Sequence, residues 1–285
     1  MSRVYRALEK AEEEKRQEVK KEPSLKVFEE KVVLKKEAPT LKFPEEKIAK
    51  IEKTEEPGLP SKEEVPVLIV PPNSFAEEEF RKLKTQVFLR FPNPPHSILI
   101  VSTGPEEGKT TVAVNLAMAI SKEIHRKAIL IDGDLRKPGI RLEQSQNGKG
   151  LSDYLSNRTP LTEVLMNSQI ENLRIIMAGS STNKSSELIG SKRMEELLKS
   201  LSESGENTYI LIDSPPIIST TEPTLLSKMV DGIILVVMAD RMPRESIQRA
   251  LKSIDRQKII GIVFNQIDLK RRSYYSKYYH QYYGK

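Results

Sequence analysis

The stretch of residues 103–111 has the residue types best suited to binding phosphate, with the sequence Thr-Gly-Pro-Glu-Glu-Gly-Lys-Thr-Thr. Between a strand and a helix, such a loop turns backbone N–H groups toward a phosphate, and the helix N-terminus adds its positive end. Lys109 would then reach the β- and γ-phosphates, and the Thr110 hydroxyl would bind Mg²⁺. The remaining nucleotide contacts in this loop are expected from Gly104, Glu107, Gly108 and Thr111.

This loop departs from the general G-x-x-x-x-G-K-[ST] pattern at its first position. Thr103 replaces the glycine, and Gly104 comes one place later. The alternative is a chance Gly-Lys-Thr-Thr at the start of a helix. Because an apolar run precedes the loop and a helical stretch follows it, the order of strand, loop and helix favours the phosphate site.

Acidic side chains follow two other apolar runs. Asp132 and Asp134 are spaced by two, which places both carboxylates on the same side of a strand terminus. Like charges this close are unfavourable unless a cation lies beside them, and Mg²⁺ on the nucleotide would supply one. Asp213 follows the run Tyr-Ile-Leu-Ile, in the position of a Walker B aspartate that holds Mg²⁺. A purely structural role, with Asp132 capping a turn, is the alternative for the first pair.

Six short apolar runs without polar alternation predict strands that are covered on both faces. They are residues 97–102, 128–131, 173–177, 209–212, 232–237 and 259–264. Helical stretches follow at residues 109–123, 186–204, 223–229 and 244–255. This alternation predicts an α/β fold with a doubly wound, mostly parallel sheet, in which ligands bind beyond the carboxyl ends of the strands. The candidate residues above all lie at such ends.

Composition divides the chain into four regions. Residues 1–21 predict a helix with a narrow apolar stripe, and residues 22–73 are rich in Lys, Glu and Pro, which predicts an extended, disordered linker. A helix capped by Ser74 opens the folded domain, residues 74–268, and residues 269–285 form a tyrosine-rich tail.

Charge and composition also limit the function. The chain has no cysteine, so it has no disulfide or thiolate metal site. Its net charge of +6 comes from basic residues that mostly alternate with Glu, and we expect no nucleic-acid partner. The first residues are charged and no apolar run is long enough to cross a bilayer, so we expect a cytoplasmic protein.

From about Phe75 onward, the chain resembles the bacterial tyrosine kinases of capsule and exopolysaccharide synthesis, or BY-kinases. After the phosphate loop come ILIDGDLRKPGI, GLSDYLSNRTPL, NLRIIMAGS, SELIGSKRMEELL, YILIDSPP, VDGIILVVMADRMPRESIQRAL and IIGIVFNQ, in the order of the family. The resemblance implies a P-loop fold of the MinD and ParA type and a protein-tyrosine kinase that uses ATP and Mg²⁺. Asn265 lies where related ATPases contact the base, and a simple strand-end cap is the equal alternative.

The resemblance implies partners as well. A membrane polysaccharide co-polymerase would activate the kinase and hold it at the inner membrane, and a cognate tyrosine phosphatase would oppose it. Family subunits meet in a ring through an E-x-x-R-x-x-R helix, which reads Glu78, Arg81 and Lys84 here. Lysine lacks the planar guanidinium group of arginine, so a bidentate contact with a carboxylate at this position is weakened. Glu106 stands where the family often has glycine, and Lys184-Ser185 replaces an Asn-Pro.

Six tyrosines in three pairs make the tail the expected substrate. They are Tyr274, Tyr275, Tyr278, Tyr279, Tyr282 and Tyr283. The alternatives are an aromatic stripe on a helix and an aromatic platform for RNA, and a polar, terminal context disfavours both. Because tyrosine has a pKa of about 10, a base must take its proton. We assign this role to Asp132, with Asp134 and Asp213 organising Mg²⁺, although Asp132 and Asp134 can exchange roles. Lys109, Asp132 and Asp134 are therefore the expected catalytic residues.

Phosphorylation would change the charge of the tail. From Lys270 onward, five basic residues and one terminal carboxylate give about +4, and each phosphate adds about −1.5 to −2. Two or three phosphates reverse the sign, so subunits are expected to associate when unphosphorylated and to separate when phosphorylated.

Two other functions are possible for this sequence. A ParA/MinD-type ATPase would carry a signature lysine where Gly104 stands and would have no tyrosine tail. A catalytically silent, nucleotide-responsive adaptor is disfavoured by the intact Lys109, Thr110 and acidic residues.

Overall fold

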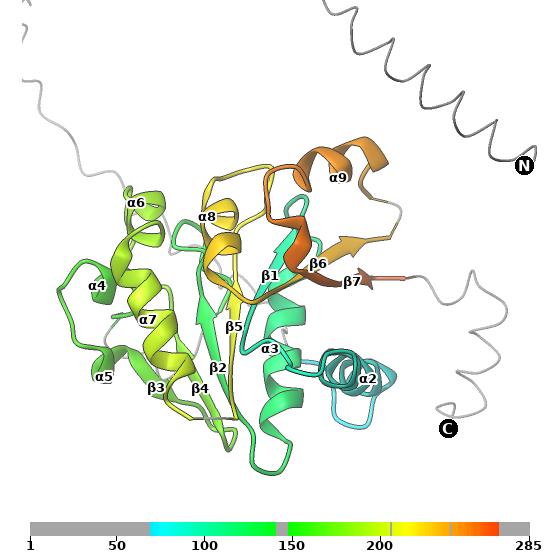
Figure 1. Ribbon diagram of the computed structural model, residues 1–285, viewed down its shortest axis with the longest axis horizontal. Coiled ribbons are helices and arrows are strands. Elements are labelled where there is room, and N and C mark those ends of the chain that lie inside the picture. The colour runs from blue at the N-terminus through cyan, green and yellow to red at the C-terminus, as the bar shows by residue number, and fades with distance from the viewer. Residues whose placement is uncertain (1–68, 141–147, 206, 240, 268–285) are drawn as a thin grey trace, which may run out of the picture. The chain divides into compact units, whose positions relative to one another are not determined.

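The computed structural model describes residues 69–140, 148–205, 207–239 and 241–267, all within the unit Lys62–Lys285. The expected helix over residues 1–21, most of the linker over 22–73 and the tail over 269–285 lie outside the described residues. Within the described part, seven strands form one sheet in the order β3-β4-β2-β5-β1-β6-β7 (Figure 1). The α/β sheet predicted from the apolar runs is therefore confirmed.

The sheet is parallel except at one edge, where β3 runs antiparallel to β4. The strands are β1 (Ser97–Ser102), β2 (Lys127–Asp132), β3 (Leu165–Asn167), β4 (Leu173–Ile176), β5 (Thr208–Asp213), β6 (Gly232–Met238) and β7 (Ile259–Asn265). Every residue of the central strands β1 and β5 is buried. Their unbroken apolar sequence follows from this burial on both faces.

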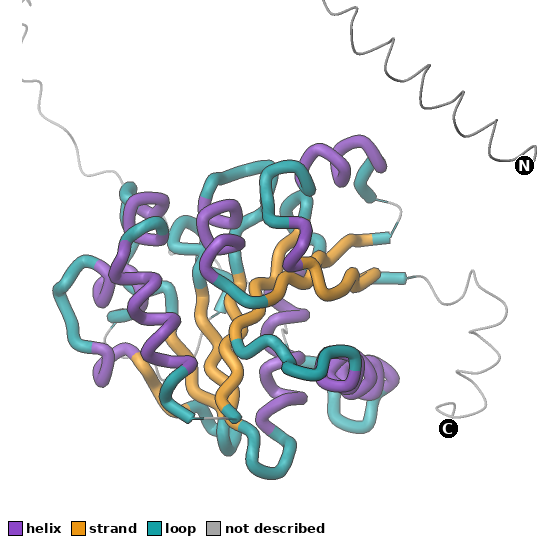
Figure 2. Tube along the Cα trace, in the orientation of Figure 1, coloured by secondary structure: helices purple, strands orange, loops and turns teal. Residues whose placement is uncertain are grey.

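Helices cover both faces of the sheet (Figures 1 and 2). On one face, α2 (Phe75–Leu89) and α3 (Lys109–Ser121) form one apolar cluster with the strands. The helices that contribute to the cluster on the opposite face are α4 (Leu151–Leu155), α5 (Leu161–Val164), α6 (Ser185–Ile189), α7 (Lys192–Ser202), α8 (Glu222–Met229) and α9 (Arg244–Ala250). A 3-10 turn, η1 (Arg256–Lys258), precedes β7. None of the helices in the described part has the length and apolar character needed to span a bilayer.

The register of the central strands brings the acidic residues together. Asp132 on β2 lies directly opposite Asp213 on the neighbouring strand β5. On the other side of β5 lies β1, which ends at Ser102, where the phosphate loop begins. Because parallel strands end at the same edge of a sheet, the loop and both aspartates share one edge.

Helix α2 is held by α3 and the turn that follows it. Lys122, directly after α3, pairs with Glu77 of α2 at 2.7 Å. Ser74 caps α2 as predicted, because its side chain accepts a hydrogen bond from the Glu77 N–H at 3.2 Å. The first turn of α2 is therefore stabilised by the Ser74 cap and by the ion pair with Lys122 after α3.

The structure differs from the sequence expectation on the second face. The helix expected over residues 186–204 is two helices, because α6 ends at Gly190 and Ser191 then caps α7, accepting from the Met194 N–H at 3.4 Å. The sequence does not predict β3, α4 or α5. Segments of three to five residues are too short to show a hydrophobic period.

Candidate nucleotide site

The phosphate loop joins β1 to α3 and requires glycine where α3 begins. Gly108, the N-cap of α3, has a φ of 88°, and a Cβ there would lie 1.9 Å from the Asn265 Nδ2 atom. The same Nδ2 donates a hydrogen bond to the Glu107 carbonyl oxygen at 2.9 Å. Asn265 therefore holds the loop backbone from the end of β7, and its contact with a nucleotide base stays a prediction.

Glu107 directs its carboxylate to the loop's own backbone. The side chain is buried, and its Oε2 accepts a hydrogen bond from the Thr103 N–H at 2.9 Å. Burial raises the pKa of Glu107, while backbone donors at Gly104 and Thr103 and the charge of Arg241 act in the opposite direction. The carboxylate thus shapes the loop, and a direct contact of Glu107 with the nucleotide stays a prediction.

Glu106, which departs from the family pattern, has a partner on another loop. Its φ of 60° lies in the left-handed region that favours glycine. Arg241, after β6, lies 3.0 Å from the Glu106 carboxylate and donates to its carbonyl oxygen at 3.3 Å. Met242 lies against Gly104, where a Cβ would be 3.3 Å from the methionine sulfur. The sequence does not predict these two contacts, because the partners are more than 100 positions apart along the chain.

Asp213 is brought to the start of α3. It is buried, and its Oδ2 accepts a hydrogen bond from the Thr110 hydroxyl at 2.6 Å. Its Oδ1 is also buried and has no hydrogen-bond partner of normal geometry among the described residues. Burial raises the pKa of Asp213 to about 6, although the positive charge of Lys109 and the Thr110 hydrogen bond lower it. Three of the predicted site residues therefore meet at this point.

Asp132 is enclosed by the loop that follows it. The side chain is buried, and its Oδ2 accepts from the N–H groups of Gly139 at 3.1 Å and Ile140 at 3.0 Å. Its Oδ1 accepts from the Asp134 N–H at 3.1 Å. Burial, and then the negative charge of Asp213, raise the pKa of Asp132 to about 7 against these donors. A carboxyl group with a pKa near neutrality is suited to taking up a proton at physiological pH.

The side chains at this edge fit a bound Mg²⁺. Thr110, Asp134 and Asp213 supply hard oxygen atoms, and in the part of the chain that the structure describes the Asp213 Oδ1 has no hydrogen-bond partner. Within the ranges that the structure describes, no three His, Cys, Asp or Glu side chains are grouped to hold a metal by themselves. Mg²⁺ is usually bound through one or two carboxylates together with substrate phosphates. This set of donors therefore suits an ion that arrives with a nucleotide.

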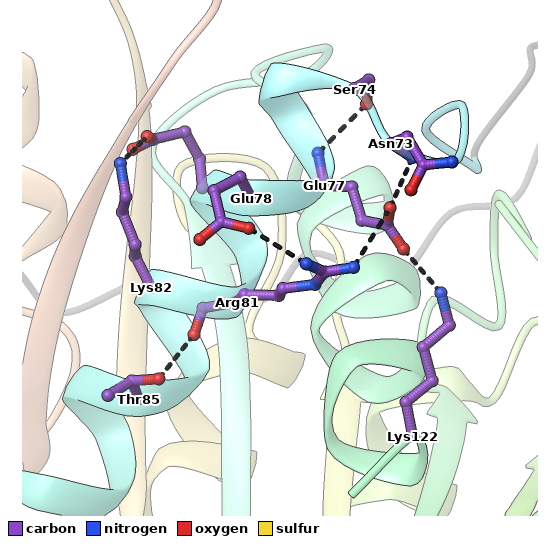
Figure 3. A network of polar contacts seen from close by, with 9 residues as sticks. Asn73, Ser74, Glu77, Glu78, Arg81, Lys82, Thr85 and Lys122 are labelled. Carbon is purple, nitrogen blue, oxygen red and sulfur yellow. Dashed lines mark hydrogen bonds and ion pairs between the residues drawn. The ribbon is translucent and has the colours of Figure 1, made fainter. Parts of the chain in front are cut away.

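The predicted subunit contacts lie on α2 and differ in exposure, and Figure 3 shows Arg81 directed toward Glu78 and Glu77. Arg81 lies 3.1 Å from Glu78 and 3.7 Å from Glu77, and its side chain is 54% exposed. Lys84 is only 13% exposed, and its Nζ lies 2.5 Å from Glu123, just after α3. Glu78 and Arg81 therefore face solvent, whereas Lys84 joins α2 to the turn after α3.

The fold and the phosphate loop define a P-loop nucleotide-binding protein. The model of the AAA domain family matches residues 98–262. A putative tyrosine-protein kinase, CapB of Staphylococcus aureus, is 28% identical over 212 residues, which cover 73% of this chain and 92% of that protein. The tyrosine-protein kinase CpsD of Streptococcus pneumoniae serotype 4 is 30% identical over 204 residues, covering 70% of this chain and 88% of CpsD. The crystal structure of the chimerical protein CapA2B2 is similar with a TM-score of 0.62 at 28% identity, covering 69% and 87% of the two chains.

The chain belongs to the family of bacterial tyrosine kinases and contains an AAA domain over residues 98–262. The resemblance seen in the motifs is thereby confirmed, and so are the nucleotide-binding fold and the enzyme class. The roles of the individual residues stay predictions.

Proposed function

We propose that this chain transfers the γ-phosphoryl group of ATP to tyrosines of its own C-terminal tail, between subunits, and so regulates capsule or exopolysaccharide synthesis and export. The observation that carries the proposal is the meeting of Lys109, Thr110 and Asp213 beside Asp132 at one sheet edge. The six tyrosines lie outside the described residues. Tyr274 follows the last residue of β7, Asn265, by only nine positions, so at full extension it reaches about 30 Å from that strand.

The roles follow from the placement of the side chains. Lys109 and the loop N–H groups would hold the β- and γ-phosphates. Asp132 would take the proton of the acceptor hydroxyl, because ionising a free tyrosine at neutral pH costs about 4 kcal/mol. Thr110, Asp134 and Asp213 would hold Mg²⁺, which when bound neutralises charge on the phosphates. The roles of Asp132 and Asp134 can be exchanged, so both require a variant.

The proposal is tested by mapping phosphate on the tail. Phosphatase-treated protein incubated with Mg-ATP is expected to gain phosphate on peptides that contain Tyr274 to Tyr283, as measured by mass spectrometry. A variant with all six tyrosines changed to phenylalanine serves as the control and should gain none there. ATP hydrolysis without tail phosphate would instead indicate a positioning ATPase of the ParA/MinD type.

We also propose a homo-oligomer, ring-like in form, that works with a membrane polysaccharide co-polymerase and is reset by a tyrosine phosphatase. The resemblance to capsule and exopolysaccharide kinases supports these partners. The co-polymerase would hold the kinase at the cytoplasmic side of the inner membrane.

Assembly is expected to depend on both the tail and α2. Dephosphorylated protein should form oligomers in light scattering, and fully phosphorylated protein should be monomeric, because phosphates reverse the tail charge. Arg81→Ala should also yield monomers, since it removes the exposed guanidinium that is predicted to contact the neighbouring subunit.

Lys82 provides the matched control, because it pairs with Glu79 at 2.7 Å on the same helix with similar exposure but lies outside the predicted contact motif. Lys82→Ala should leave assembly unchanged. Equal masses for phosphorylated and dephosphorylated protein would refute the tail mechanism, and equal effects of the two substitutions would refute the contact assigned to Arg81.

A further inference from the structure

A buried carboxylate joins three segments of the second helical face. Glu222, at the start of α8, is 1% exposed, and its Oε1 accepts hydrogen bonds from the Ser185 hydroxyl at 2.7 Å and the Arg136 Nε at 2.9 Å. The Arg136 Nε also donates to the Ser185 Oγ at 2.8 Å, and an outer guanidinium nitrogen donates to Ser186 at 3.3 Å. Burial acts to raise the pKa of Glu222, but hydrogen bonds from Ser185, its own backbone N–H, Thr220 and Arg136 prevail and hold it at about 2.

The three residues come from segments that carry the acidic site residues or lie beside them. Arg136 belongs to the loop after β2, two residues beyond Asp134. Glu222 is the first residue of α8, the helix that follows β5, and β5 ends at Asp213. Ser185 opens α6 and contacts both partners. The hydrogen bonds therefore tie the loop that carries Asp134 to the first residues of α6 and α8.

The loop after β2 also holds Asp132. Gly139 and Ile140 of this loop donate their N–H groups to the Asp132 carboxylate. Arg136 lies between Asp134 and these two donors in the sequence, so anchoring its side chain limits the positions that both the donors and Asp134 can take. A buried carboxylate that loses its cation is left uncompensated, so the contact differs from an exposed surface ion pair.

We propose that Arg136, Ser185 and Glu222 form a positioning group for phosphoryl transfer, which we call the aspartate-loop latch. The latch holds the loop after β2 so that Asp132 and Asp134 keep their places beside Asp213. None of the three is a catalytic residue, because they act through the loop. This inference rests on the proposed function for its kinetic consequence, and on the contacts alone for its structural consequence.

The kinetic test compares Arg136→Ala with the wild type in tail phosphorylation. The kcat is expected to fall about 10- to 100-fold, since small displacements of reacting groups have effects of this size, with little change in KM for ATP. Arg136→Lys, which keeps the charge, should restore part of the rate. The double variant with Glu222→Ala should lose no more than Arg136→Ala alone, because both residues act through one contact.

Arg158 provides the matched control. It is 54% exposed and lies 3.3 Å from the 6% exposed Asp153, whereas Arg136 is 53% exposed and Glu222 1% exposed. Arg158→Ala should lower the melting temperature to a similar extent and leave kcat unchanged. A loss of kcat of equal size in both variants would show that Arg136 matters only for stability. Additive losses in the double variant would show that Arg136 and Glu222 act independently, and either result would overturn the proposal.

Hydrogen exchange separates this inference from the proposed function. Arg136→Ala should speed exchange of the Gly139 and Ile140 amides, and Arg158→Ala should not. This result is expected even if the wild type does not phosphorylate its tail, in which case the proposed function fails and the latch stands. Unchanged protection of these amides in Arg136→Ala would reject the latch whatever the kinase activity.

Discussion

Replacing Lys109 with methionine is expected to reduce tail phosphorylation at least about 100-fold, because a preorganised positive charge on the transferring phosphoryl group supplies an effect of this order. Lys109 is the first residue of α3, and its charge acts on the buried Asp213. Removing it therefore also leaves Asp213 without a cation that lowers its pKa. Phosphotyrosine on the tail peptides, quantified by mass spectrometry over time, measures the loss.

The same variant shows whether transfer occurs between subunits. Lys109→Met keeps the tail, whereas the variant with six phenylalanines keeps the active site. When the two are mixed with Mg-ATP, phosphate should accumulate on the tail of Lys109→Met. If the tail of Lys109→Met gains no phosphate in the mixture although the wild type phosphorylates its own tail, transfer takes place within one chain. The proposed transfer between subunits is then wrong.

The second large effect is expected from Asp132→Asn. Loss of a general base lowers rates about 10²- to 10⁴-fold, and ATP affinity should be unchanged because Lys109 and the loop are intact. In the wild type the rate should rise as pH increases through about 7, since Asp132 must be deprotonated to accept a proton. The variant should lose this dependence. Single-turnover rates at saturating ATP, measured across pH, provide the comparison.

Asp153 serves as the control for this substitution. It is also a buried aspartate, and its Oδ2 accepts from the N–H groups of Gly150 and Ser180 at 3.0 Å each. Asp153→Asn should leave the rate and its pH profile unchanged. Normal tail phosphorylation by Asp132→Asn would remove the base assignment, and loss from Asp134→Asn with the same pH signature would transfer it to Asp134.

The central strands could be predicted because burial on both faces requires continuous apolar runs. The run over residues 259–264 is also expected to be covered on both faces, and this expectation is wrong: β7 is an edge strand, and its Ile262 and Phe264 are exposed. The shared edge of Asp132 and Asp213 follows from parallel strands alone. Their direct pairing does not, since it depends on β2 lying next to β5, and no local pattern encodes this strand order.

Contacts between distant loops could not be predicted for the same reason. Arg136 and Glu222 are 86 positions apart, and Glu106 and Arg241 are 135 apart. Each is an ordinary charged residue in its own segment, and its partner is known only once the chain has folded. Lys84 is a similar case, because its neighbour Glu123 lies on a turn that the helical pattern includes in a longer helix.

Helix α3 begins at Lys109 and ends one residue before Lys122, whose ion pair holds the start of α2. Its 13 residues span about 20 Å. The predicted phosphate-binding residue Lys109 therefore lies at the start of α3, and the ion pair to α2, the predicted subunit-contact helix, lies at its end. Coupling between ATP binding and subunit association is reciprocal: if assembly raises the affinity for ATP by some factor, ATP binding raises the association constant of the subunits by the same factor. For a positive coupling through α3, a fall in cellular ATP would weaken the proposed assembly by mass action alone, before any tyrosine is modified.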